Sequence, residues 1–373
     1  MALIAIRRPE VPVRDLRVAA YLIPTDYPEA DGTLEWHDTG LVLVEVKAGN
    51  ETGIGYTYGP ARPIAFLIAD VLKEAVEGTD AMDVETIWWK MVHVVRNAGR
   101  PGIASMAISA VDAALWDLKA RLLKVPLVSL LGAAREHIPA YGSGGFTTCS
   151  SERLLAQFGE WAQQGIKRFK LKVGRRESDD IQRVRDLREA LGPEADLRVD
   201  ANGAFSRKEA LRYAHQFQQW DVSWFEEPAS SDDLEGLRLI RDEGPPGMDI
   251  TAGEYGYDLG YFRRMLESGA VDVLQADATR CAGITEFLRV GALCQAFGIP
   301  LSAHTAPSLH LHPCCALGPV RDIEYFHDHV RIEQMLFDGT ARPRGDGHLA
   351  PDMARPGMGL EFRRADAARY EVA

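Results

Sequence analysis

Seven ionisable residues recur at nearly regular intervals through the second half of the chain. They lie 20 to 28 residues apart, about one strand–helix unit each, and each ends or follows a short apolar segment typical of a buried strand. In order, they are Lys172, Asp200, Glu226, Glu254, Asp277, His304 and Glu324. A single carboxylate after a strand is more often a helix cap than a functional group. Helix caps alone, however, do not explain seven ionisable residues at the same position of successive strand–helix units. If the strands close into a parallel barrel, these side chains meet at one mouth.

Three carboxylates of this series follow adjacent predicted strands, namely Asp200, Glu226 and Glu254. Ionised carboxylates this close repel one another and need a cation nearby. Oxygen ligands suit Mg²⁺, with Mn²⁺ as a substitute, and the lack of His or Cys among the three argues against zinc. The alternative is that one or more of them pairs with Arg198 or another base. We expect a magnesium site at the barrel mouth.

Acid–base groups are predicted on two sides of this site. Lys170 and Lys172 alternate with apolar residues on one strand, so both point into the barrel, where their mutual repulsion would depress the lysine pKa and favour a lysine base. Asp277 and His304 end neighbouring strands, and a carboxylate on one imidazole nitrogen raises the basicity of the other. Other residues of reactive type are expected to be structural: His310, His312, His327, His329 and Cys281.

The composition excludes several classes of protein. The chain has 373 residues, 46% of them hydrophobic and 26% charged, which fits a globular protein with more than one domain. Its net charge of −12 and lack of a long basic run argue against a nucleic-acid or membrane-surface binder, whereas a buried metal ion still permits an anionic substrate. Five cysteines without a C-x-x-C pair, and no signal-like or membrane-spanning segment, lead us to expect a cytoplasmic protein.

The elements that must position these residues fall into three parts. Residues 1–130 read as an α+β domain, with strands at 16–22 and 41–46 and helices at 61–75 and 102–124. Residues 131–345 alternate short strands with amphipathic helices, the signature of a parallel barrel. We expect its strands at 138–141, 168–173, 197–200, 222–226, 249–254, 271–274, 299–304 and 322–325. Residues 346–373 lack this pattern and are expected to return to the first domain.

Several local motifs, taken together, identify a family resemblance. They are Lys170-Leu-Lys172, Asp200-Ala-Asn202-Gly203, Glu226-Glu227-Pro228, Gly253-Glu254, Asp277 with Ala282-Gly283-Ile284-Thr285, and Ser302-Ala-His304. As a set they resemble the enolase superfamily, in its mandelate racemase/muconate lactonizing enzyme-like family and the mandelate racemase subgroup. The likeness extends over essentially the whole chain. It implies an α/β fold, a modified (β/α)7β TIM barrel with an α+β N-terminal capping domain whose loops close the site.

The resemblance also implies a first chemical step. Mg²⁺ binds the carboxylate of the substrate, a base removes the proton α to it, and the metal stabilises the resulting enediolate. Lys172 matches one base of the family, and Lys170 matches the lysine that holds the substrate carboxylate. The residues that match the metal ligands are Asp200, Glu226 and Glu254.

The same resemblance implies roles for four further residues. His304 with Asp277 matches the base on the opposite face of the substrate. Glu324 matches the acid that hydrogen-bonds the substrate carboxylate. Asn202 matches a position that can contact a substrate hydroxyl.

Bases on both faces permit two outcomes. Protonation of a departing β-hydroxyl by His304 gives a dehydratase that converts an acid sugar, an aldonate or aldarate, to a 2-keto-3-deoxy acid. Return of a proton to Cα instead gives a racemase or epimerase of a 2-hydroxy acid. His304 argues against a cycloisomerase, since cycloisomerases of the superfamily usually pair lysines.

The expected closing loop, residues 21–33 followed by 35–37, is polar. Its polarity favours a polyhydroxylated substrate, although the same residues could merely solvate a loop. We therefore favour dehydration over racemisation, with a non-catalytic sugar-acid-binding or structural protein as a remote alternative. The expected partner is a small-molecule carboxylate, and a homo-oligomer is expected.

Overall fold

The computed structural model describes residues 10–372, and the first part of the chain forms an antiparallel sheet with helices packed on it. The sheet order is β15-β1-β2-β3. Its strands are β1 (Val13–Ala30), β2 (Glu35–Ala48), β3 (Glu51–Tyr58) and β15 (Glu371–Val372). The predicted strands at 16–22 and 41–46 correspond to β1 and β2, which are both longer than predicted, while β3 was missed.

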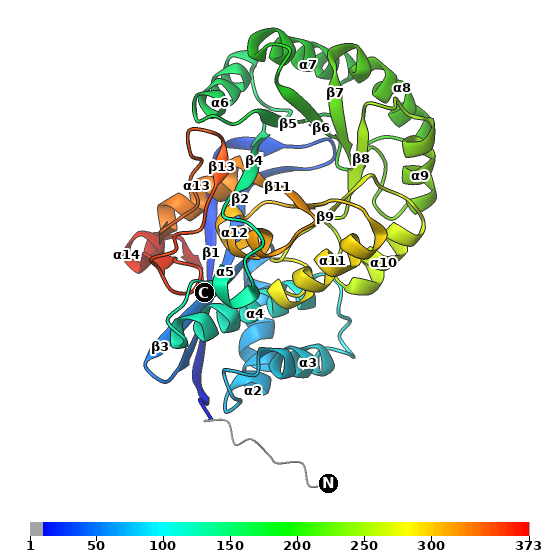
Figure 1. Ribbon diagram of the computed structural model, residues 1–373. Helices are drawn as coiled ribbons and strands as arrows, with labels where there is room; N and C mark the ends of the chain where they lie inside the picture. The colour runs from blue at the N-terminus through cyan, green and yellow to red at the C-terminus, as the bar shows by residue number, and fades with distance from the viewer. Residues whose placement is uncertain (1–9, 373) are drawn as a thin grey trace.

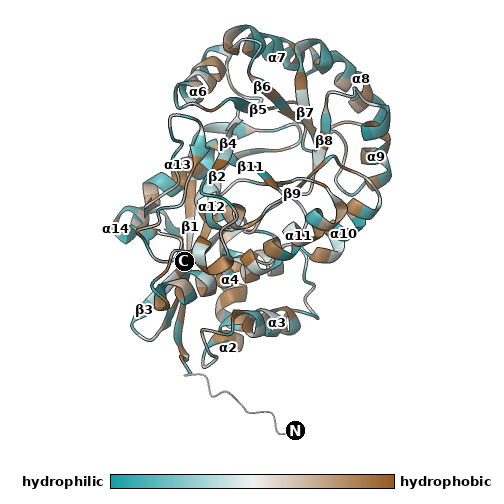
Figure 2. Ribbon diagram, in the orientation of Figure 1, coloured by the Kyte–Doolittle hydropathy of each residue, from teal (hydrophilic) through white to brown (hydrophobic). Residues whose placement is uncertain are grey.

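Two glycines allow β3 to lie against the long helix α4 (Ile103–Leu122) at close range. A Cβ atom on Gly53 would lie 2.3 Å from the carbonyl oxygen of Ala114, and one on Gly55 would lie 2.2 Å from that of Ala110. Helix α4 is buried around most of its circumference, as its apolar sequence predicts, and it is coloured largely as hydrophobic in Figure 2. The helix therefore joins the cap sheet to the rest of the molecule.

The other cap helices surround α4. A π-helical turn, Ile68–Leu72, joins α1 to α2 and so forms the continuous helix that the sequence predicts at 61–75. Helix α3 was not predicted. The bounds of these helices are α1 (Ala61–Leu67), α2 (Lys73–Val76), α3 (Val84–Val94) and α5 (Leu127–Leu131).

The second part of the chain is a closed barrel of eight parallel strands, as predicted (Figure 1). The strands follow one another in chain order, and pairing of the last strand, β11, with the first, β4, closes the barrel. They are β4 (Ile138–Gly144), β5 (Arg168–Lys172), β6 (Asp196–Asp200), β7 (Val222–Glu226), β8 (Asp249–Ala252), β9 (Val273–Ala276), β10 (Leu301–Ala303) and β11 (Val320–Phe326). Glu254, Asp277 and His304 therefore lie just after their strands.

Helices cross over between successive strands and form the outer layer of the barrel (Figure 1). A side chain caps the first turn of α6, α8, α9 and α10, and at α8 Ser206 and Glu209 form a capping box. The helices are α6 (Ser151–Gln163), α7 (Glu177–Leu191), α8 (Arg207–Phe217) with a 3-10 turn at Gln218–Trp220, α9 (Leu234–Glu243), α10 (Leu259–Glu267), α11 (Ile284–Phe297), α12 (Pro307–Ala316) and α13 (His327–Leu336). No helix among residues 10–372 combines the length and apolarity needed to cross a bilayer.

The last part of the chain runs from the barrel back to the cap. It places β13 (His348–Leu349) antiparallel to β4, and it ends with β15 paired to β1. The backbone N–H of Leu127 donates to the carbonyl oxygen of Gly357 at 2.7 Å. The other elements here are β12 (Phe337–Asp338), β14 (Glu361–Phe362), α14 (Arg364–Ala367) and a 3-10 turn at Ala368–Tyr370.

Residues 21–33 were predicted to form a closing loop, and this prediction is wrong. Most of the segment is part of strand β1, which continues to Ala30, and only a short turn separates it from β2. The Asp31 carboxylate fixes this turn by accepting the backbone N–H groups of Thr33 and Leu34. Gly32 lies so close to the barrel that a Cβ atom there would be 2.6 Å from the carbonyl oxygen of Ala201. The closing element is thus a β-hairpin whose tip rests on the ends of the barrel strands (Figure 1).

A buried ionic layer fills the barrel beneath its mouth. The guanidinium of Arg198, a residue with no exposed surface, lies 2.8 Å from Asp322 and stacks over Tyr141 and Trp224. Ser302 donates a hydrogen bond to the other oxygen of Asp322. Arg198 is therefore neutralised away from the proposed magnesium carboxylates, which removes the pairing with Arg198 considered above.

This layer leads to a stability prediction. Asp322→Ala leaves the buried Arg198 charge with Asp196, 3.0 Å away and partly exposed, as its remaining carboxylate partner. We expect the free energy of unfolding to fall by about 3 kcal/mol. The control is Glu235→Ala, since the Glu235 side chain is 92% exposed, and we expect a change of about 1 kcal/mol or less. Chemical denaturation followed by circular dichroism measures both. Equal losses in the two variants would contradict the importance of the layer.

Candidate functional site

A cavity of about 580 Å³ lies between the cap and the barrel mouth, and most of the predicted site residues line or underlie it. Its barrel side includes ionisable groups, whereas its cap side is mainly aromatic and aliphatic. The barrel contributes Lys172, Asn202, Glu254, Tyr255, Arg280, His304, Thr305, Glu324, Phe326 and His329. The cap contributes Leu22, Asp31, Leu34, Trp36, Asp38, Thr39, Tyr58 and Met106, with the backbone of residues 40 and 59–61.

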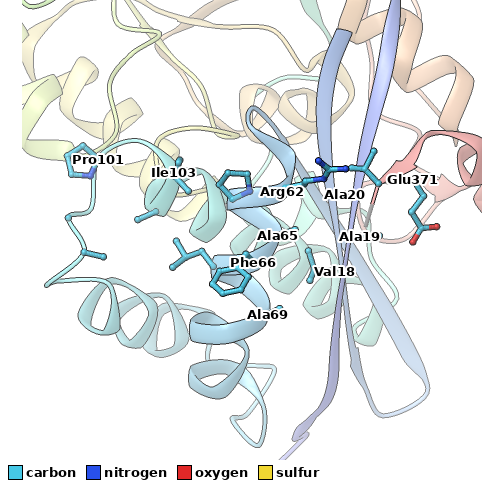
Figure 3. A pocket seen from close by; sticks show the side chains of 16 residues that line it. Val18, Ala19, Ala20, Arg62, Ala65, Phe66, Ala69, Pro101, Ile103 and Glu371 are labelled. Atoms are coloured by element: carbon cyan, nitrogen blue, oxygen red, sulfur yellow. The ribbon is translucent and has the colours of Figure 1, made fainter.

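A larger groove of about 980 Å³ lies on the cap, away from the barrel mouth (Figure 3). It is formed by β1, α1 and the start of α4, and its surface is mostly apolar, with Phe66 and Ile103 both exposed. It holds none of the predicted site residues. The chemistry-bearing groups are therefore in the smaller cavity.

The three predicted metal carboxylates do converge. Asp200, Glu226 and Glu254 are all buried, and each offers an oxygen within 4.8 Å of those of the other two. The Oε2 atom of Glu254 has no hydrogen-bond partner. Burial raises the pKa of Glu226 well above its ordinary value, and the Asp200 charge raises it further. An orphaned oxygen and crowded carboxylates fit a hard divalent cation such as Mg²⁺.

The two lysines lie among these carboxylates, whose charges oppose the effect of lysine–lysine repulsion on the lysine pKa. Lys172 Nζ is 2.5 Å from Asp200, and Lys170 contacts Glu226 and lies 2.8 Å from Glu324. Burial lowers the pKa of each lysine, yet the neighbouring carboxylates outweigh burial and lysine–lysine repulsion, so both values lie above the ordinary lysine range. The surplus of negative charge dominates this side of the site.

His304 and Asp277 form the predicted pair on the opposite side. His304 Nδ1 is 2.8 Å from Asp277, while its Nε2 is 3.4 Å from Glu254 Oε2. Burial raises the pKa of Asp277, but the hydrogen bond and charge of His304 bring it below the ordinary value. His310, expected to be structural, accepts the backbone N–H of Ala278 and thereby supports the turn that carries Asp277.

Glu324 and Asn202 complete the predicted set. Glu324 is held from three sides, by Lys170, by the Ser143 hydroxyl at 2.6 Å and by the backbone N–H of Thr305. Burial raises the pKa of Glu324, and Lys170 outweighs it to give a value of about 2. Asn202 has a left-handed backbone, with φ of 47°, and its backbone N–H donates to Asp200, while its side-chain Oδ1 has no partner.

Several residues of the cavity were missed in the sequence. Arg280 lies 3.3 Å from Glu254 and follows Asp277 by one turn, a spacing that could have indicated its position. His329, expected to be structural, accepts a hydrogen bond from the Ala306 backbone but also lines the cavity, where it stacks on Tyr58 with 3.5 Å between ring centres. No sequence signal joins Tyr58 to the barrel, because the two are brought together only by the packing of the cap.

A second cluster of potential ligands, Asp26, Glu29 and His327, lies where the cap hairpin meets α13. Asp26 pairs with Arg153 at 2.7 Å and with His327 at 3.2 Å. Glu29 takes part in neither pair and accepts the Trp36 indole N–H. Asp26 and His327 form a contact between hairpin and barrel, which agrees with the structural role expected for His327.

Comparison with known proteins agrees with this geometry. The sequence model described as "Mandelate racemase / muconate lactonizing enzyme, N-terminal domain" matches residues 18–132, and the model described as "Enolase C-terminal domain-like" matches residues 153–367. The chain belongs to the mandelate racemase/muconate lactonizing enzyme family. It is therefore an enzyme of the enolase superfamily.

Two relatives of the family resemble the chain over most of its length. A 3,6-anhydro-alpha-L-galactonate cycloisomerase from Streptomyces coelicolor is 32% identical over 94% of this chain and 98% of its own. An L-talarate/galactarate dehydratase from Salmonella typhimurium is 32% identical over 89% of this chain and 82% of its own.

Two solved structures of the family share the fold. A mandelate racemase/muconate lactonizing enzyme-like protein from Rubrobacter xylanophilus is 50% identical, with a TM-score of 0.94, over 98% of this chain and all of its own. A racemase from Streptomyces coelicolor with bound magnesium is 31% identical, with a TM-score of 0.91, over 96% of this chain and all of its own. Magnesium is thus the cofactor of the family, in agreement with the expected cofactor.

The carboxylate cluster leads to a binding prediction. Glu254→Gln removes one charge from the cluster, and we expect the affinity for Mg²⁺ to fall about 10-fold or more. Glu267→Gln, on the exposed face of α10, is the matched control and should bind Mg²⁺ as the unmodified protein does. Isothermal titration calorimetry with Mg²⁺ alone measures both. Unchanged affinity in Glu254→Gln would place the cation elsewhere.

Proposed function

We propose that this enzyme abstracts the proton α to the carboxylate of an acid sugar and dehydrates the sugar to a 2-keto-3-deoxy acid. The observation that carries the proposal is the arrangement at the barrel mouth. A cluster of buried carboxylates fit for Mg²⁺ lies between Lys172 on one side and the His304–Asp277 pair on the other. The dehydratase among the relatives supports the same reaction.

In this proposal Asp200, Glu226 and Glu254 hold the cation. Bound there, Mg²⁺ supplies positive charge beside the substrate carboxylate, where negative charge develops as the proton leaves. Lys170 orients the same carboxylate by its charge, and Glu324, 2.8 Å from Lys170, holds the lysine in place. Lys172, the lysine that reaches the cavity surface, takes the proton from Cα. A dication held by Asp200 would offset the carboxylate charge that raises the pKa of Lys172.

His304 acts on the other face. Asp277 holds the Nδ1–H of His304, which leaves Nε2 directed at the cavity side of the pair. His304 delivers a proton to the β-hydroxyl as the Cβ–O bond breaks, so water leaves and a Cα–Cβ double bond forms. Tautomerisation of the resulting enol gives the 2-keto acid.

The unpartnered polar atoms of the cavity support a hydroxylated substrate. Asn202 Oδ1 and the Tyr58 hydroxyl both lack a hydrogen-bond partner. Hydroxyl groups of a sugar acid would satisfy them, whereas an aromatic ring would leave them unpaired.

Two other reactions share the first step of proton abstraction. Racemisation or epimerisation of a 2-hydroxy acid is favoured by the neighbour named as a racemase. Cycloisomerisation, which His304 argues against, is favoured by the relative named as a cycloisomerase. The reaction products distinguish all three.

We further propose three general properties of the protein. The chain is divided into three parts at residues 130 and 345, the protein is cytoplasmic, and it forms a homo-oligomer. The mass of the protein in solution, by light scattering, tests the last.

The proposed reaction is tested with a library of acid sugars and 2-hydroxy acids in D₂O with Mg²⁺. We expect one acid sugar to give a 2-keto acid, with all turnover lost on addition of EDTA. Exchange at Cα without a keto acid would instead establish racemisation or epimerisation, and a ring-opened or ring-closed isomer would establish cycloisomerisation. An absence of both exchange and product from the whole library would contradict the proposal.

The two bases are tested separately. Lys172→Ala and His304→Asn should each lower kcat on the substrate so found by about 10²–10⁴-fold or more, because each removes a proton-transfer group. Lys208→Ala and His215→Asn, on the exposed face of α8, are the controls. Full activity in either site variant would remove that residue from the mechanism, and calorimetry with Mg²⁺ checks that the cation still binds.

A further inference from the structure

The charged groups around the cavity are distributed unequally between its two walls. Both basic residues that line it, Lys172 and Arg280, belong to the barrel, and each is already paired with carboxylates. On the cap side, the charged residues that line it are Asp31 and Asp38, both acidic. Among residues 10–372, the cap therefore contributes no cation to the cavity lining.

Basic residues close to the hairpin are directed to other partners. Arg153 pairs with Asp26, Arg175 with Glu35 at 2.9 Å, and Arg331 with Asp328. The His329 imidazole, on the barrel helix α13, lines the cavity next to the cap, where it is stacked on Tyr58 and accepts a backbone N–H. Burial lowers its pKa well below the ordinary value, so the ring is neutral.

The rest of the cap wall is apolar. Leu22 and Leu34 on the hairpin, Met106 on α4 and Trp36 on β2 line the cavity, with Phe326 of the barrel beside them. The Trp36 indole N–H is already donated to Glu29 at 2.9 Å, so this side chain offers its ring rather than a donor. A substrate whose carboxylate lies at the Lys170–Lys172 side therefore has its far end against apolar surface and acidic side chains.

We propose that the substrate is a monocarboxylate acid sugar, an aldonate whose far end is an uncharged hydroxymethyl or methyl group, and that aldarates are rejected. The inference rests on the proposed function and narrows it. A second carboxylate at the far end would lie near the acidic Asp38 and the buried Asp31, with no cation on the cap wall to neutralise it, which is costly in a partly enclosed site. A hydroxyl or methyl end avoids that cost and fits the apolar wall.

The inference is tested with matched pairs of the same configuration, such as galactonate with galactarate and gluconate with glucarate. Cα-proton exchange in D₂O and keto-acid formation are measured for both members of each pair with Mg²⁺. For the configuration that reacts best, we expect kcat/KM to be about 100-fold or more higher for the aldonate. An aldarate that reacts as well as its aldonate, or better, overturns the inference while leaving the proposed function intact.

Charge variants at the rim test the physical reason. Asp38 is exposed at the cavity edge, and Asp38→Arg should raise the ratio of aldarate to aldonate kcat/KM by about 10-fold or more, with Asp38→Asn producing a smaller rise. Asp70→Arg, an exposed site in the π-helical turn outside the cavity, makes the same change in net charge and should leave the ratio unchanged. An unchanged ratio in Asp38→Arg, or an equal rise in Asp70→Arg, overturns the assignment.

Failure of the proposed reaction can be distinguished from failure of the proposed aldonate preference. If no acid of the library exchanges its α proton, binding of the same pairs to the Mg²⁺-loaded protein is measured by calorimetry. Tighter binding of the aldonate then supports the inference without the reaction. Equal binding, tighter binding of the aldarate, or no binding of either overturns it.

Discussion

The balance of charge at the barrel mouth is the constraint on which the rest of the site depends. Buried carboxylates gather there in excess of the basic groups that face them, and they include Asp200, Glu226, Glu227, Glu254, Asp277 and Glu324. Lys170, Lys172 and Arg280 neutralise only part of this charge. The orphaned Glu254 oxygen and the raised pKa values of Glu226 and Glu227 are the visible signs of the deficit. A divalent cation is the simplest group that restores neutrality.

The fold supports this charge by enclosing it. Beneath the mouth, Arg198 is paired with Asp322, so its charge is separate from the lysine–carboxylate contacts of the site. Above it, the cap is fixed by contacts made outside the cavity, among them the hydrogen bond from the Tyr56 hydroxyl to Glu333 at 2.6 Å. The cap can therefore vary the residues that face the substrate without disturbing the groups that perform the proposed chemistry.

This division explains what the sequence could predict. The barrel and most of its site residues follow from the regular spacing in the sequence, since an ionisable residue at the end of seven of the eight strands must reach the same mouth. The strand β3 was missed because Gly53 and Gly55 weaken its strand pattern, and they are present for the close approach of α4. Helix α3 is rich in Trp, Val and Ile, which favour strands as much as helices. The spacing shows that the two lysines lie together, but it does not show how closely Asp200 and Glu226 approach them.

Specificity is less visible in the sequence for the same physical reason. Asp38, Trp36 and Tyr58 are distant in sequence from the barrel residues, and nothing in their spacing indicates that they face His304 or Lys172. Only the length of the β1–β2 hairpin and the seating of Gly32 on the barrel bring these residues over the mouth. The polar character of residues 21–33 suggested a cavity wall that hydrogen-bonds the substrate. In the structure, however, the Asp31 carboxylate accepts hydrogen bonds from the turn, and the Trp36 indole N–H donates to Glu29. The wall that results is apolar and acidic, which is why the proposed preference for an uncharged far end depends on the folded cap and not on the composition of the segment.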